Sequence, residues 1–194
     1  MDFIDIIFAI IVGMGFTFFI DYLKIFSLTT TNIIVFFLFL TTYFFIISDW
    51  IFYHELMDKY PYTKNYTRFF IDIIVFFLMF LLTYSAFISI NTKLLVFYVA
   101  NVAVWHLSVI AWHISAIKEY QNMKQKIVES IKAHTIRFVW YTLIGISYFI
   151  ASQFIANEIV TYSTVAVIVM ISIWFFNLRR LNYFKTQTPQ NYRV

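Results

Sequence analysis

The sequence predicts an all-α polytopic membrane protein with six transmembrane helices and with its N- and C-termini in the cytoplasm. Of its 194 residues, 62% are apolar and 12% are charged, against about 45–50% and about 25% in soluble domains. The apolar residues also gather into stretches near the roughly 20 residues that a helix needs to cross a bilayer. These predicted spans leave no room for a soluble domain, so residues 1–194 form one transmembrane domain. The spans are about 3–23, 31–53, 68–89, 94–117, 135–156 and 159–178.

The basic residues between the spans predict the orientation. One set of connecting segments carries only Lys24 and Lys93, while the other set carries the remaining twelve Lys and Arg residues. Lys/Arg bias in short loops sets membrane topology, so the basic side is predicted to be cytoplasmic. The twelve residues are Lys59, Lys64, Arg68, Lys118, Lys124, Lys126, Lys132, Arg137, Arg179, Arg180, Lys185 and Arg193.

The first span carries a stripe of small and polar residues at every fourth position: Asp5, Ala9, Gly13, Thr17 and Asp21. One interpretation is close packing between helices, which small residues permit. The other is a water-filled or pore-lining face, because ionisable groups in membranes tend to face cavities. The two acidic residues are roughly 24 Å apart at 1.5 Å per residue, so they would flank a conduit and could not share one ion.

The second and third spans carry ionisable residues near their predicted cytoplasmic ends. Asp49 and His54 lie late in the second span, and Asp72 lies early in the third. Arg68 precedes Asp72 by one turn, which predicts an i,i+4 ion pair. The sequence has no nucleophile elbow, phosphate-binding glycine loop or metalloprotease motif. We therefore expect a structural role for these residues and no enzymatic activity.

The fourth span repeats a Trp-His pair after seven residues, which gives His106 and His113. The two are roughly 10 Å apart along a helix, too far to bind one metal through bonds of about 2 Å. His54 and His134 are expected near helix ends, away from this depth. The prediction is packing histidines bonded to backbone or to groups such as Asn101, with no metal or cofactor. Because histidine titrates near neutrality, pH sensing is an alternative.

The segment 118–134, before the fifth span, places Tyr120, Met123, Ile127 and Ile131 at three- and four-residue spacing among charged residues. This pattern predicts an amphipathic helix that lies on the inner leaflet or extends the fourth span. Basic residues beside helix ends attract anionic lipid headgroups. The predicted partner of these charges is the lipid bilayer and not nucleic acid.

The opening of the first span, Phe3-Ile4-Asp5-Ile6-Ile7-Phe8-Ala9-Ile10, resembles that of the six-helix bacterial members of the endolysosomal potassium leak channel family. That family has a Phe-Ser-Asp motif followed by a Val-Phe-Ala-Ile-like run, and Ile4 stands at its serine position. Further similarities lie at Trp50 and His54, at Asp72, and at Tyr84-Ser85-Ala86. The identical positions in the opening helix are Phe3, Asp5, Phe8, Ala9 and Ile10.

The resemblance implies a homotetrameric channel for monovalent, potassium-like cations in a prokaryotic cytoplasmic membrane, with the first helices around one axis. No Thr-Val-Gly-Tyr-Gly filter loop is present, so a hydrophobic constriction would gate by dewetting. Ile10 is the matching constriction residue. The implied pore-lining residues are Asp5, Ile6, Ile10, Gly13, Met14, Thr17 and Asp21.

An alternative function is a membrane regulator or effector subunit, for example in phage defence, that recruits a soluble cytoplasmic partner through its basic face. A small lipid-modifying enzyme is a weaker third interpretation. The first two differ in what the Asp5–Asp21 stripe faces. A channel needs the stripe on a symmetry axis, whereas an interaction protein would bury it between helices of one protomer.

Overall fold

The computed structural model describes residues 3–59, 61, 66–121, 124–154 and 158–187, and within them the fold is all-helical. Six helices in this part of the chain are long and apolar enough to cross a membrane. This confirms the predicted fold class and the number of spans, and it indicates a multi-pass membrane protein. The elements are α1 (Phe3–Lys24), α2 (Thr30–Lys59), α3 (Tyr66–Ile88), a 3-10 turn η1 (Thr92–Leu94), α4 (Leu95–Glu119), α5 (Lys124–Phe154) and α6 (Glu158–Gln187).

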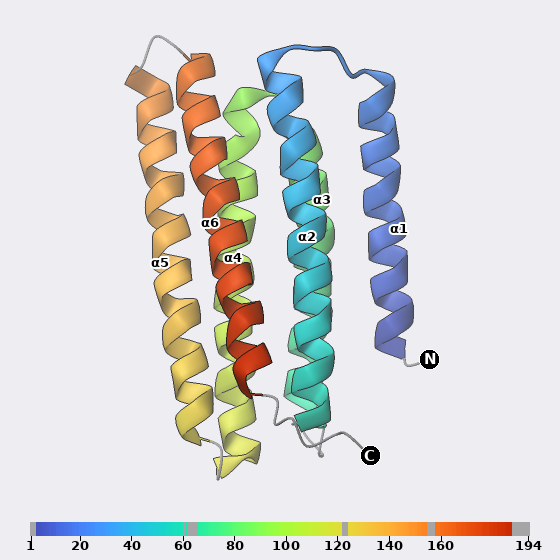
Figure 1. Cartoon of the computed structure of the whole chain (residues 1–194), viewed down its shortest axis with the longest axis vertical. Helices are drawn as coiled ribbons and strands as arrows, with labels where there is room; N and C mark the ends of the chain where they lie inside the picture. The colour runs from blue at the N-terminus through green and yellow to red at the C-terminus, as the bar shows by residue number, and fades with distance from the viewer. Residues whose placement is uncertain (1–2, 60, 62–65, 122–123, 155–157, 188–194) are drawn as a thin grey trace.

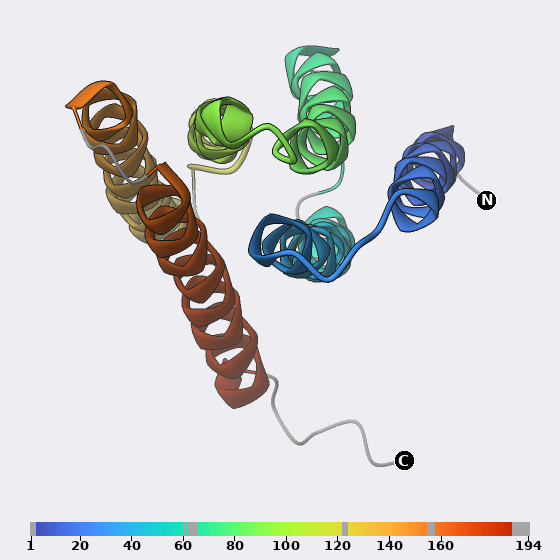
Figure 2. The same ribbon diagram turned by 90° about the horizontal axis from the view of Figure 1, so that it is seen from above.

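The six helices stand side by side along the long axis of the molecule (Figure 1). α4 packs against α3 and α5, α2 packs against α3 and α6, and α1 packs mainly against α3. Seen from above, α1 lies at one edge of the bundle and the α5–α6 pair lies at the opposite edge (Figure 2). The start of α1 and the end of α6 lie at the same end of the bundle (Figure 1). Which end is cytoplasmic stays a prediction from charge.

Several helices extend beyond the apolar stretches. α2 continues to Lys59, although the apolar pattern ends near 53, and α6 continues to Gln187, although its pattern ends near 178. Hydropathy marks the part of a helix that suits hydrocarbon, whereas backbone hydrogen bonding continues as long as no residue interrupts it. The predicted polar tail at 188–194 lies outside the described residues.

The prediction of one amphipathic helix over 118–134 was wrong, because this segment is divided between two helices of the bundle. α4 ends at Glu119, and residues 124–134 form the first part of α5. The apolar side of this part packs on α4: Ile127 is buried against Trp112 and Ala116, and Ile131 packs beside them. These apolar residues at helical spacing therefore face α4 in a helix hairpin. We had expected these residues to face lipid. Met123 lies outside the described residues.

At the end of the bundle opposite the α4–α5 connection, η1 makes contacts to α5 and α6. The Tyr148 hydroxyl of α5 donates to the Thr92 carbonyl at 2.6 Å, and the Thr92 hydroxyl donates to the Glu158 carboxylate at the start of α6. Asn91 caps the turn through its side chain, which accepts from the Lys93 amide. These bonds connect the α3–α4 and α5–α6 connections, and they give Glu158 a structural role.

Candidate functional site

One side of α1 faces the bundle and approaches it closely. Ile11 and Tyr22 are buried in the core, and Gly15 between them is also buried. A Cβ placed on Gly15 would lie 2.9 Å from Thr83 Cγ2 and 3.1 Å from Tyr43 Oη. Real Cβ atoms essentially never come within 3.0 Å of another heavy atom. Glycine at this position therefore sets how closely α1 packs against α3.

The other side of α1 is exposed on the protomer and carries nearly all the residues expected to line a pore. Ile10 is 55% exposed, and Ile6 and Met14, one turn away on either side, are 45% and 46% exposed. Gly13, Thr17 and Asp21 continue this face and are also exposed. A Cβ on Gly13 would meet no atom within 4 Å. The stripe of small and polar residues is therefore not packed between helices of one protomer.

Asp5 departs from this face because its side chain contacts α2. Its Oδ1 lies 3.3 Å from Nε2 of His54, whose Nδ1 lies 3.1 Å from the Trp50 carbonyl oxygen. A carbonyl accepts only from Nδ1–H, and a carboxylate accepts only from Nε2–H, so the imidazolium form satisfies both contacts. Trp50 also stacks on Phe8 with ring centroids 4.0 Å apart. This network anchors the first turns of α1 to α2.

The polar residues further along α1 have partners within the same helix. The Thr17 hydroxyl donates to the Gly13 carbonyl at 3.2 Å, which satisfies it without a neighbouring helix. Asp21 accepts from Lys24 at 2.7 Å, one turn later. Both acidic ends of the predicted stripe are therefore paired within the protomer, Asp5 with a histidine and Asp21 with a lysine. Local pairs reduce the field that these carboxylates would create at a pore mouth.

Arg68 is the most buried cation among the described residues, and Glu119 is its ion-pair partner across α3 and α4. Arg68 is fully buried, its Nη1 lies 2.9 Å from Glu119 Oε2, and its guanidinium lies 4.5 Å from the centre of the Trp112 ring. Asp72, the partner expected one turn along α3, is buried beside it. Sequence spacing identified the neighbour on the same helix, but a partner 51 residues away depends on the packing of α3 against α4. Asp49 is also buried, on α2.

The histidines of α4 have an unexpected neighbour. His134 lies on α5 at the same depth, with its Nδ1 3.1 Å from Nδ1 of His106 and its ring 5.6 Å from that of His113. The expectation that no other histidine shares their depth was wrong, because α5 begins ten residues before His134. All three side chains are buried. His113 also bonds to the Val109 carbonyl at 2.7 Å and to the Ser130 hydroxyl at 2.8 Å.

Asn101, which we expected beside these histidines, instead connects α4 to α3. Its Nδ2 donates to the Leu81 carbonyl at 3.3 Å and lies 3.2 Å from the Ser85 hydroxyl oxygen. A similar polar bridge joins α4 to α2, where the Tyr98 and Thr42 hydroxyls are 2.9 Å apart. These bonds satisfy polar groups inside a bundle that offers them little water. They account for Asn101 and Tyr98 by packing alone.

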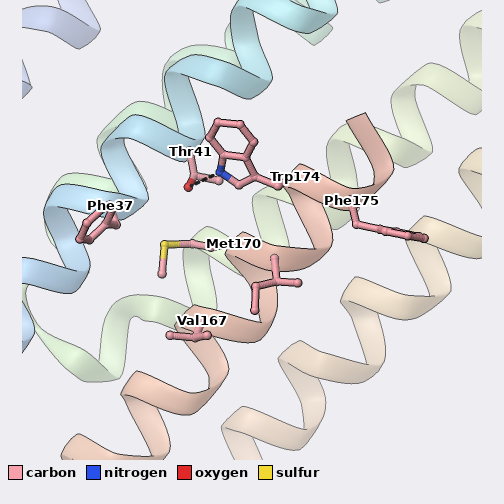
Figure 3. Close-up of a pocket in the computed structure, with 7 residues that line it drawn as sticks. Phe37, Thr41, Val167, Met170, Trp174 and Phe175 are labelled. Carbon is pink, nitrogen blue, oxygen red and sulfur yellow. Dashed lines mark hydrogen bonds between the residues drawn. The ribbon is translucent and has the colours of Figure 1, made fainter. Parts of the chain in front are cut away.

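A shallow groove lies between α2 and α6. The Trp174 indole donates to the Thr41 hydroxyl at 3.2 Å across it (Figure 3), and Trp174 also stacks on Phe44. None of the lining residues is titratable or nucleophilic except the bonded threonine, so the groove offers no catalytic chemistry. Its lining is Phe37, Thr41, Val167, Met170, Ile171, Trp174 and Phe175.

Comparisons with protein-family models, with curated proteins and with solved structures gave no match to this chain. The functional assignment therefore depends on the residues and contacts described above and on the resemblance of the opening helix.

Proposed function

We propose that this chain is the subunit of a homo-oligomeric cation channel, in which the exposed faces of several α1 helices line a hydrophobically gated pore. The observation that carries the proposal is the exposure of the α1 stripe. The regulator interpretation expected this stripe to be buried within one protomer, whereas Gly13, Thr17 and Asp21 are exposed. A second copy of α1 would give this face a partner.

The apolar residues on this face support a constriction. Ile6, Ile10 and Met14 recur at four-residue spacing, and each is about half exposed. A narrow ring of such side chains excludes water, since wetting it costs more than the few hydrogen bonds gained, and so blocks ions until it widens. Ile10 is central in this run and lies opposite the buried side of α1. We assign it as the constriction.

The anchoring network supports a defined orientation of this face. The Asp5–His54 contact and the Phe8–Trp50 stack fix the first turns of α1 to α2, and Gly15 fixes its middle to α3. A pore-lining helix needs this fixed rotation because a turn of about 100° would exchange Ile10 for its neighbour Ile11. Monovalent cations, with potassium as the first candidate, are the proposed substrates.

The test is ion flux through purified protein in liposomes. Ile10→Asn should raise potassium flux because it makes the ring easier to wet, and Ile10→Trp should lower it. Ile171→Asn is the matched control: Ile171 is 63% exposed on α6 and lies at a similar distance from the middle of its helix. Ile11 would be a poor control because it is buried in the core. Flux no greater than in empty liposomes for the wild type and for Ile10→Asn would refute the channel and favour the regulator.

A further inference from the structure

The contact between His106 on α4 and His134 on α5 restricts the number of protons that the two rings can hold. Their Nδ1 atoms are 3.1 Å apart, a hydrogen-bonding distance. One Nδ1 must therefore carry a hydrogen and the other must present a lone pair. The first histidine can take up an extra proton on its Nε2 and still donate. The second could become an imidazolium only by placing N–H against N–H, which would end the contact.

We propose that His106 and His134 form a buried site that binds one proton in addition to the N–H hydrogen of each neutral ring. Binding of a second added proton would separate α4 from α5 at this level. Both side chains are at least 97% buried, since their exposures are 3% and 2%. Two imidazolium ions in contact would repel each other strongly in this poorly hydrated position. The site therefore responds to acid in two distinct steps.

Two charged residues lie on the helices that pack against the pair. On α5, Arg137 lies one turn from His134 and carries a permanent positive charge. Its guanidinium lies 5.2 Å from the centre of the Phe176 ring of α6. On α2, Phe45 packs against His106, and the buried carboxyl group of Asp49 follows one turn later.

Uncharged aromatic rings from α4 and α5 also pack against the pair. Tyr141 of α5 stacks on His106 at 5.5 Å and 17°, and Trp105 of α4 packs against both histidine rings. α3, on another side of α4, directs its Arg68 at Trp112 and at Glu119, toward the end of the bundle.

His113 and Ser130 lie between the pair and the end of the α4–α5 hairpin. Ser130 is half-buried and bonds to Nε2 of His113, whose ring lies 5.6 Å from that of His134. Ser130 lies six residues after Lys124, roughly 9 Å along α5, and Lys124 is exposed. The inference does not depend on whether α1 lines a pore.

A metal ion is the competing occupant, because two ring nitrogens at this distance could also bind one ion. Within the described residues, no group of three or more His, Cys, Asp or Glu side chains is arranged to hold a metal. Both ring nitrogens of His113 are already engaged. The structure therefore favours the proton.

The test is nitrogen-15 NMR of histidine-labelled full-length protein in lipid nanodiscs, from pH 8 to pH 4.5. The chain has four histidines, so single His→Gln variants assign every signal. At pH 8, one ring of the pair should be the Nδ1–H tautomer and the other the Nε2–H tautomer. On acidification, the pair should gain a single imidazolium first, and the second should appear only together with loss of the contact.

The variants distinguish a shared site from two independent histidines. In His134→Gln, His106 should titrate in one step, whereas His113→Gln should leave two steps for the pair. Simultaneous one-step titration of both wild-type rings would overturn the proposal, as would two rings that stay neutral to pH 4.5. One equivalent of Zn²⁺ per protomer by elemental analysis would also overturn it. The wild-type spectrum decides between these outcomes even if a variant fails to fold.

Discussion

Gly13 and Gly15 sit two residues apart on α1 and should respond in opposite ways to the same added methyl group. In a helix, Gly→Ala stabilises by roughly 1 kcal/mol through backbone entropy. At Gly13 nothing lies within 4 Å of the new Cβ. We therefore expect Gly13→Ala either to leave the free energy of unfolding unchanged or to raise it by up to this amount. At Gly15 the new Cβ would lie 2.9 Å from Thr83 Cγ2 and 3.2 Å from Thr83 Cβ. Overpacking of a close-packed site costs about 1–3 kcal/mol.

The difference between the two variants isolates the packing penalty. Helix propensity and effects on the unfolded chain are common to both substitutions and cancel, so Gly15→Ala should be less stable than Gly13→Ala by about 1–3 kcal/mol. The free energy of unfolding is measured in mixed micelles by SDS titration, with helical circular dichroism as the signal. The Tyr43 hydroxyl lies at the end of a side chain that can move, whereas Thr83 Cβ cannot. Thr83 is therefore the residue that resists.

A second substitution tests this mechanism. Thr83→Ser removes the Cγ2 methyl and keeps the hydroxyl that donates to the Phe80 carbonyl at 2.8 Å. In the Gly15→Ala background it should restore part of the lost stability, and in the wild type it should have a smaller or unfavourable effect. Equal stability of Gly13→Ala and Gly15→Ala would refute the close approach of α1 to α3. So would the absence of any coupling between positions 15 and 83.

Two further predictions concern the ends of the bundle. Arg68→Met should destabilise by roughly 3–5 kcal/mol because it removes the cation that faces the buried Glu119 carboxylate, and adding Glu119→Gln should recover much of the loss. A double variant no better than the single one would contradict the ion pair. The chain contains no cysteine, so a single introduced cysteine reports its own position. Leu28→Cys, at a position 87% exposed, should react with an impermeant thiol reagent in intact cells, and Gln125→Cys should not. The reverse pattern would refute the orientation predicted from charge.

Hydropathy alone was enough to predict the helices, because crossing hydrocarbon requires a long apolar run and a closed set of backbone hydrogen bonds. The same signal failed at 118–134, where apolar residues at helical spacing suit a lipid surface and a helical neighbour equally well. Only the packing of Ile127 onto Trp112 and Ala116 distinguishes the two. Helix ends were also missed, since polar residues such as those of α2 after residue 53 continue a helix without any apolar signal.

Contacts between distant residues were the harder part of the site. The i,i+4 rule proposed a partner for Arg68 on its own helix, but it could not propose Glu119 on the next helix, with which Arg68 forms an ion pair. His134 was assigned to a helix end because the apolar pattern begins at 135, whereas α5 begins at Lys124. Counting polar residues at helical spacing from Lys124 would have placed Ser130 and His134 on one face. That is the signal that could have identified the histidine cluster.

The exposure of α1 has a different meaning from the exposure of α5 and α6. Within one protomer, 17% of the most apolar part of α1 is buried, and 22% of that of α5 and of α6. The corresponding share is 50% for α2 and for α3. The uncovered residues of α6 near its middle are large and apolar, as lipid requires, for example Ile171 and Phe175. α1 also exposes large apolar residues near its middle, such as Ile10 and Met14, but beside them it exposes Gly13 and Thr17, which offer little apolar surface to lipid. Small residues allow close approach of another helix or of water. A second copy of α1 across a symmetry axis would supply the other helix and would enclose water between the copies. The pore proposal therefore uses α1 alone.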